Sequence, residues 1–136
     1  MSSISRPLAG PSLTFHLAAE VQTLREDEAY RRSGRAGRTL VKDERFRVVL
    51  LAVADQVDIG THNADSPMTL HVVQGGLRYR DAGGEYELHE GDLLYFGGGQ
   101  AEDIRATAES ALLLTLSATN DDFKNEGRAN APGASS

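Results

Sequence analysis

The feature that most constrains this chain is a long series of short apolar segments, separated by glycines, between Thr39 and Ser117. Short strands at such regular spacing, bounded by turn residues, are typical of an all-β sandwich or barrel. The stretch VVLLAV (Val48–Val53) has no polar alternation, so we expect this strand to lie between two layers. The expected strands are Thr39–Asp43, Arg45–Val53, Gln56–Ile59, Met68–Val73, Leu77–Arg80, Glu85–His89, Asp92–Phe96, Asp103–Ala106 and Ala111–Ser117.

The sequence before this series has a different periodicity. Apolar residues recur at three- and four-residue steps from Leu13 to Leu24, which predicts a helix over Leu13–Arg32 with Ser12 as its N-cap. The segment RRSGRAGR follows, and its arginines are either a solvated loop leading into the first strand or a clamp for an anion. We therefore divide the chain into an N-terminal extension with a helix (1–37), a barrel (38–118) and a flexible C-terminal tail (119–136).

Composition excludes several classes of protein. The 136 residues are 40% hydrophobic, enough for one core, and the formal net charge of -6 argues against nucleic acid or an anionic membrane as partner. No segment approaches the roughly 20 apolar residues that span a bilayer. The absence of cysteine excludes disulfides and thiolate ligands. The first residues lack the apolar region of a signal peptide, which favours a cytoplasmic location.

The order of the motifs resembles that of a known family. A GxH motif at Gly60–His62 follows a strand, the strand MTLHVVQGGLRYR comes next, and YELHEGDLLYFGGGQAEDIRA follows a hairpin. From about Arg38 to Ser117 the chain resembles the cupins, and the helix followed by RVVLLAV is similar to a branch of small single-domain bacterial RmlC-like cupins. The resemblance implies a double-stranded β-helix, a jelly-roll barrel, with an N-terminal α-helix.

The resemblance also implies where a metal would bind. Metal-binding cupins usually offer three histidines and a glutamate from the barrel interior. His62 matches the first histidine, but Ala64 stands at the second, Met68 (or Thr69) at the glutamate, and Glu102 at the third histidine. Only His62 and Glu102 remain as donors, so the resemblance implies a degenerate metal site that holds a divalent transition metal weakly at most.

The interior of the barrel is the expected ligand pocket. Strand alternation places Glu102, Ile104 and Ala106 on one face, whereas His71 is out of phase with its neighbours and is expected to point away from the interior. The predicted pocket residues are His62, Ala64, Met68, Leu70, Phe96, Gln100, Glu102 and Ile104.

No catalytic residue is certain, and His62 and Glu102 are the candidates. Each has a plain alternative, because His62 also suits packing at a loop mouth and Glu102 suits an exposed loop. If the two side chains face each other, the carboxylate raises the pKa of the imidazole, and the pair can act as general acid and base. A hydroxyl could come from Tyr79, Tyr86 or Tyr95, although these residues equally suit packing or an interface.

Three classes of function follow from these alternatives. The first is a small-molecule-binding or sensor barrel that lacks a full metal-ligand set. The second is an enzyme, either a metal-dependent oxygenase or isomerase with an unusual ligand set, or a metal-free acid/base isomerase using His62 and Glu102. The third is a structural scaffold. The missing ligands favour the first class, and a homodimer is expected because the resemblance implies that sheets pair.

Overall fold

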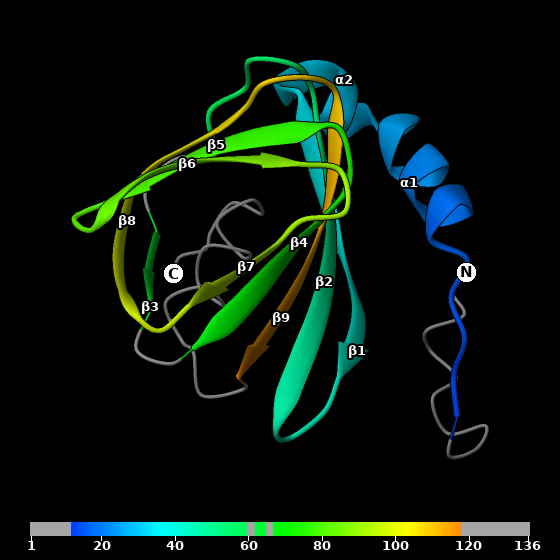
Figure 1. The fold of residues 1–136 in the computed structure, drawn as a ribbon. Coiled ribbons are helices and arrows are strands. Elements are labelled where there is room, and N and C mark those ends of the chain that lie inside the picture. Colours follow the sequence, from blue (N-terminus) through cyan, green and yellow to red (C-terminus); the bar gives the residue numbers. More distant parts are fainter. Residues whose placement is uncertain (1–11, 60–61, 65–66, 118–136) are drawn as a thin grey trace.

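The computed structural model describes residues 12–59, 62–64 and 67–117. In this part of the chain, nine strands form two antiparallel sheets that face each other, which confirms the all-β prediction (Figure 1). The five-stranded sheet has the order β1 (Arg35–Lys42), β2 (Phe46–Val53), β9 (Ser110–Ser117), β4 (Met68–Gln74) and β7 (Leu93–Phe96). The four-stranded sheet has the order β3 (His62–Ala64), β8 (Gly99–Ala106), β5 (Gly76–Asp81) and β6 (Gly84–His89).

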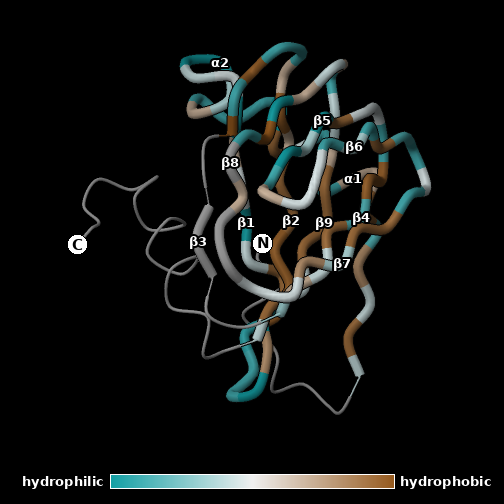
Figure 2. Tube along the Cα trace, turned by 60° about the vertical axis from the view of Figure 1, so that its left-hand side comes forward, coloured by the Kyte–Doolittle hydropathy of each residue, from teal (hydrophilic) through white to brown (hydrophobic). Residues whose placement is uncertain are grey.

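The main core fills the space between the two sheets. Its members come from alternate positions of the facing strands, such as Leu70 and Val72 on β4 and Leu112 on β9, all with at most 2% of their surface exposed. Figure 2 shows that the central strands of the larger sheet are strongly hydrophobic. A pleated strand directs successive side chains to opposite faces, so one residue in two supplies this core.

Strand β2 lies between two apolar layers, as its sequence predicts. Val49 and Val53 pack into the core between the sheets, whereas Leu50 and Ala52 pack into a second cluster on the other face. The second cluster includes Val21, which is 1% exposed and comes from the N-terminal helical region. Burial on both faces explains why this segment has so few polar residues.

The N-terminal helical region consists of two helices, α1 (Leu17–Arg25) and α2 (Glu28–Ser33), so the prediction of one continuous helix is wrong. Asp27 causes the break, because its side chain accepts a hydrogen bond from the amide of Ala29 and caps α2. The prediction of Ser12 as N-cap is also wrong, since α1 begins after His16.

The arginine-rich segment is not the predicted loop. Arg31 and Arg32 belong to the last turn of α2, which ends at Gly34 with a left-handed φ of 82°, and β1 begins at once with Arg35. The Arg35 Nη1 donates to the carbonyl of Ile59 at 3.0 Å. Arg38 pairs with Glu20 of α1 at 2.9 Å. Two of these arginines therefore tie the helices and β1 to neighbouring segments.

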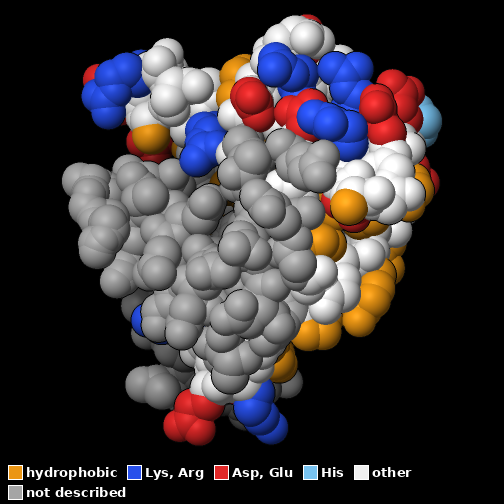
Figure 3. Space-filling view, turned by 90° about the vertical axis from the view of Figure 1, so that its left-hand side faces the viewer, with side chains coloured by type: hydrophobic (Ala, Val, Ile, Leu, Met, Phe, Trp, Pro, Cys, Tyr) orange, Lys and Arg blue, Asp and Glu red, His pale blue; other side chains and the backbone are white. Residues whose placement is uncertain are grey.

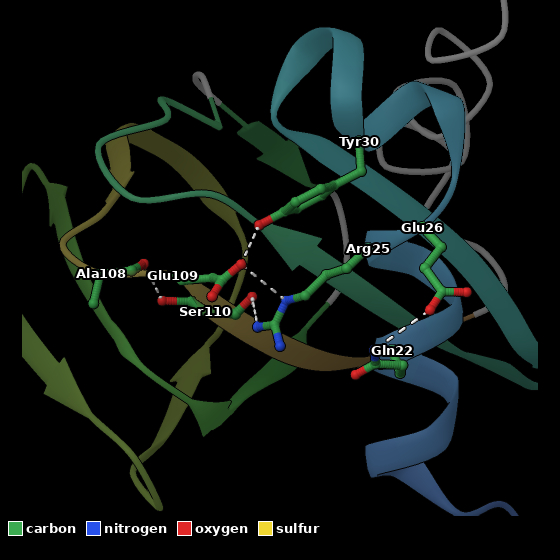
Figure 4. A network of polar contacts seen from close by, with 7 residues as sticks. All are labelled: Gln22, Arg25, Glu26, Tyr30, Ala108, Glu109 and Ser110. Atoms are coloured by element: carbon green, nitrogen blue, oxygen red, sulfur yellow. Dashed lines mark hydrogen bonds and ion pairs between the residues drawn. The ribbon is translucent and has the colours of Figure 1, made fainter.

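A polar network joins the helices to the start of β9 (Figure 4). Tyr30 donates a hydrogen bond to Glu109 at 3.0 Å, and Arg25 Nε lies 3.4 Å from the same carboxylate oxygen. Arg25 Nη2 also donates to the carbonyl of Ser110 at 3.4 Å. Burial, together with the Glu109 carboxylate, raises the pKa of Tyr30. The network fixes the helical layer against the five-stranded sheet.

The predicted strand Gln56–Ile59 is not a regular strand. It makes one isolated bridge, between Asp58 and Arg105, and Ile59 donates to the carbonyl of Ile104 at 2.7 Å. Gln56 has a φ of 67°, a left-handed conformation that interrupts extended pairing. The segment therefore runs beside β8 without continuing the sheet.

Candidate functional site

The inner face of the two sheets carries the described part of the predicted pocket. Met68, Leu70, Phe96 and Ile104 are all buried there, with exposures of 5%, 2%, 5% and 4%. Met68 and Phe96 lie opposite each other in the β4–β7 register. Met68, at the position that the resemblance assigns to a glutamate ligand, thus contributes apolar surface to the core between the sheets.

The other predicted pocket residues lie in β3 and β8, and the side chains of His62, Ala64, Gln100 and Glu102 lie outside the described part of the chain. Their backbones are placed, however. β3 pairs with β8 so that His62 lies opposite Ala101 and Ala64 lies opposite Gly99. The two motifs that carry the resemblance to cupins are therefore adjacent strands.

A bulge changes the alternation of β8. Arg80 pairs with Asp103, but the next residue, Asp81, pairs with Ala101, so the register shifts by one residue. Ala101 is 1% exposed and shares the inner core with Ile104. The prediction for the face of Glu102 relied on unbroken alternation, and the bulge removes that basis.

Tyr79 and Asp81 form a polar pair on the inner side of β5. Tyr79 is 1% exposed, packs edge-on against Phe96 at 6.2 Å between ring centroids, and donates a hydrogen bond to Asp81 at 2.8 Å. Burial raises the pKa of Tyr79, and the hydrogen bond to the Asp81 carboxylate raises it further. The other Asp81 oxygen accepts the amide of Gly83 in the hairpin turn. The tyrosine is thus a neutral donor held in one orientation.

The other two candidate tyrosines have different surroundings. Tyr86 is 46% exposed and Tyr95 is 67% exposed. Tyr86 stacks on Tyr79 with a centroid distance of 6.1 Å. Of the three tyrosines, Tyr79 is the one that belongs to the inner core.

The most informative residue of the inner face, Arg47, was missed in the sequence. It is 8% exposed, and it shares a face of β2 with Val49 and Val53, which pack between the sheets. Its Nη1 atom is buried and has no hydrogen-bond partner among the described residues. The sequence did contain a signal for this residue, because the alternation of a strand places Arg47 on the same face as Val49. However, the residues that follow Arg47 are apolar on both faces, so the sequence did not show which face was the inner one.

Arg47 lies in one row with the apolar residues of the predicted pocket. It pairs with Leu116 on β9, Leu116 pairs with Met68, and Met68 pairs with Phe96. This row crosses four strands of the larger sheet. On the edge strand β1, Lys42 lies opposite Arg47.

Metal-binding groups do not gather in the described part of the chain. Among these residues, no three His, Asp or Glu side chains lie close enough together to hold a metal ion. His71 lies between two inner-core residues of β4 and is half-buried on the outer face, as predicted. His89 approaches Asp92 at 3.6 Å beside a turn. No described helix is long and apolar enough to cross a membrane.

Solved structures with a similar arrangement of strands include several that are described as cupins. An RmlC-like cupin from Desulfovibrio desulfuricans matches 79% of this chain and 98% of its own, with a TM-score of 0.62 and 14% identity. KdgF from Halomonas sp. matches 66% of this chain and 84% of its own, with a TM-score of 0.59 and 17% identity. Salicylate 1,2-dioxygenase from Pseudoaminobacter salicylatoxidans matches 90% of this chain but 39% of its own, with a TM-score of 0.68 and 15% identity.

These similarities define the class of fold, a small RmlC-like cupin with an N-terminal helical region, and they confirm the fold that the motifs predict. No protein-family model matches the sequence, and no curated protein is similar to it.

Proposed function

We propose that this protein is a small-molecule-binding or sensor cupin whose ligand binds between the two sheets. The composition of the inner face carries this proposal. Most of its side chains are apolar, as at Met68, Leu70 and Phe96, and a few polar groups lie between them, among them the buried Tyr79 and its partly buried partner Asp81. Sites for small molecules combine apolar walls with a few well-placed polar groups in this way.

The metal site is degenerate in this proposal. Ala64 and Met68 occupy two of the four positions that cupins use for ligands, and neither side chain is a useful donor for a transition metal in this setting. Met68 is buried in the core. His62 and Glu102 are the remaining donors. With water supplying the other ligands, they would hold a divalent ion weakly.

A second candidate is a metal-free acid/base enzyme, and one observation favours it. The pair Tyr79–Asp81 lies on β5, Asp81 pairs with Ala101, and Ala101 pairs with His62. One row of the smaller sheet thus brings a carboxylate and the backbone of a histidine within two strand spacings, roughly 10 Å. In such an enzyme the Tyr79 hydroxyl, held by its hydrogen bond to Asp81, would act as a proton donor. The oxalate decarboxylase and salicylate 1,2-dioxygenase among the matching structures support an enzymatic use of the fold.

The expected homodimer would use the outer face of the larger sheet. Leu93 and Tyr95 on the edge strand β7 are 64% and 67% exposed. Figure 3 shows hydrophobic side chains along the right-hand side, where Figure 2 places β4 and β7, below a mixed group of charged residues. Exposed apolar clusters of this kind suit protein association. We expect a dimeric mass by light scattering at micromolar concentration, and a monomer would contradict the dimer.

Two measurements test the binding proposal. In amide NMR spectra of the full chain, benzamide, a neutral aromatic probe, should shift signals of β4, β5 and β8 and leave those of α1 and β1 unchanged. His62→Ala should fold and bind the probe more weakly, whereas the control His89→Ala, whose side chain is 75% exposed, should bind normally. Elemental analysis should find well under one equivalent of transition metal. Stoichiometric iron, manganese, nickel or zinc would favour the enzyme instead, and shifts confined to the outer face would exclude the inner site.

A further inference from the structure

We propose that Arg47 is the anchor of a carboxylate-binding site at the end of the sandwich where β2 begins. This inference rests on the proposed inner binding site and names the chemical class of its ligand. The starting observation is that Arg47 as a whole residue is 8% exposed, and that its Nη1 is inaccessible to solvent and has no hydrogen-bond partner in the described part of the chain.

A buried and unpaired charge is unfavourable for the folded protein. Removing an ion from water costs several kcal/mol unless an opposite charge and hydrogen bonds replace the water. Arginine cannot escape this cost by losing its proton, because its guanidinium stays charged in proteins. Buried polar groups usually have a hydrogen-bond partner, and a negatively charged ligand would supply one for Arg47.

The other buried arginine nitrogen without a hydrogen bond provides a contrast. Arg25 Nε lies 3.4 Å from a Glu109 oxygen, and Arg25 Nη2 donates to the Ser110 carbonyl. That guanidinium has its counter-ion within the fold and serves to attach the helices (Figure 4). For Arg47 no carboxylate plays this part among the described residues, and the nearby Asp43 carboxylate is bonded to Arg45 at 3.1 Å.

The charge next to Arg47 has the same sign. Lys42 lies directly opposite it in the β1–β2 register and is exposed. Directly opposed residues of an antiparallel pair lie on one face with their Cβ atoms about 4.5–5.5 Å apart, and like charges in that arrangement repel each other. An anion between them removes the repulsion and adds charge-assisted hydrogen bonds.

The apolar neighbours define the rest of the ligand. Beyond Arg47, the row continues through Leu116 and Met68 to Phe96, all at most 5% exposed. A guanidinium suits the two oxygens of a carboxylate, because its N–H groups form a planar fork. The geometry therefore suits an organic acid with an apolar body, whose carboxylate meets Arg47 and whose body lies along the row.

The test compares two probes of the same shape and different charge, benzoate and benzamide, by calorimetric titration of the full-length protein. Hydrogen bonds to charged groups contribute more than neutral ones, so benzoate should bind roughly tenfold more tightly or better. Arg47→Met should abolish this preference and keep the affinity for benzamide. Arg47→Lys should retain a part of the preference, because the charge remains but the fork is lost.

Controls separate this site from general electrostatics. Arg45→Met removes the same charge two residues away, from a side chain that is 83% exposed, and should leave the preference unchanged. Asp121 and Asp122 lie outside the described residues but follow β9 closely in sequence, so they are an internal source of carboxylate. If the double variant Asp121→Asn/Asp122→Asn bound benzoate more tightly than the natural chain, the site would belong to the chain's own carboxylates, and the free-ligand assignment would be overturned. Equal affinity supports a free ligand.

The outcomes also distinguish the two proposals. If benzamide binds on the inner face and benzoate binds no better, the inner site stands and the role of Arg47 is refuted. A preference for benzoate that survives Arg47→Met refutes it as well. If neither probe binds, both the inner site and the carboxylate anchor are wrong.

Discussion

Replacing Arg47 by methionine should stabilise the ligand-free protein. Arg47 is 8% exposed, and its buried Nη1 has no partner among the described residues, so the folded state bears a desolvation cost that the unfolded chain does not. Methionine keeps an unbranched side chain of similar reach beside Leu116, the partner of Arg47 on β9. Replacements of buried charged groups by apolar residues gain about 1–4 kcal/mol in other proteins, and we expect a gain in the free energy of unfolding of this order.

Urea denaturation followed by circular dichroism measures this change. At roughly 3–4 °C per kcal/mol for a chain of this size, the thermal midpoint should also rise by several degrees. The control Arg45→Met, at an exposed position, should leave the midpoint unchanged. If Arg47→Met is more stable and has lost its preference for benzoate, the natural arginine lowers stability in return for binding, a trade-off that is common at binding sites. If Arg47→Met were less stable than the natural chain, the guanidinium would have a partner in the ligand-free protein. The proposal that Arg47 binds the carboxylate of a ligand would then fail.

Three further changes test the framework of the site. Ser110→Ala should cost about 1–3 kcal/mol in urea denaturation, because the buried Ser110 hydroxyl accepts the Gly76 amide at 3.0 Å and donates to the Gly76 carbonyl at 2.9 Å. Leu24→Ala should cost about 2–5 kcal/mol in the same assay, because Leu24 is 2% exposed on the buried face of α1. Tyr79→Phe should flatten the loss of stability at alkaline pH. The pKa of Tyr79 in the folded protein lies above its ordinary 10.0. The protonated hydroxyl therefore stabilises the natural chain fully below pH 10, and this contribution is lost as pH rises further. Unfolding midpoints that fall equally in both proteins above that pH would contradict this assignment.

The sequence predicted the strands well where two signals agreed. From Met68 to Phe96, alternating apolar residues lie between glycine-containing turns, and β4 to β7 begin and end within one or two residues of the expected positions. The prediction failed where a local feature interrupted a regular pattern. The helical period continued through Asp27, but the side chain of this residue caps a second helix. Gln56–Ile59 has strand composition, but its left-handed residue prevents regular pairing.

The site was harder to predict than the fold. Apolar periodicity was sufficient to place Met68 and Phe96 on the inner face, because both follow a regular alternation. The bulge in β8 has no sequence signature of its own, and it removes the basis for extending the alternation to residues before Asp103. Arg47 belongs to the strand that carries apolar residues on both faces, so its pattern alone does not show which side is the inner one.

The row that begins at Arg47 also limits the size of a ligand. From β2 to β7 it crosses three strand spacings, about 14 Å in all at ~4.8 Å each. The extended arginine side chain occupies part of that span, and Phe96 at its far end contacts the Tyr79 ring. An organic acid anchored at Arg47 and about as long as one or two rings would therefore reach Phe96 and come near the Tyr79–Asp81 pair. In that position, Arg47 and the Tyr79–Asp81 pair would suit a sensor, because they fix both ends of its ligand. They would equally suit an enzyme, because the Tyr79 hydroxyl is a proton donor near the end of the ligand away from the carboxylate. Binding affinity alone does not separate these functions, but the fate of the bound acid does. A sensor releases the acid unchanged, whereas an acid/base enzyme exchanges its carbon-bound protons with deuterated water.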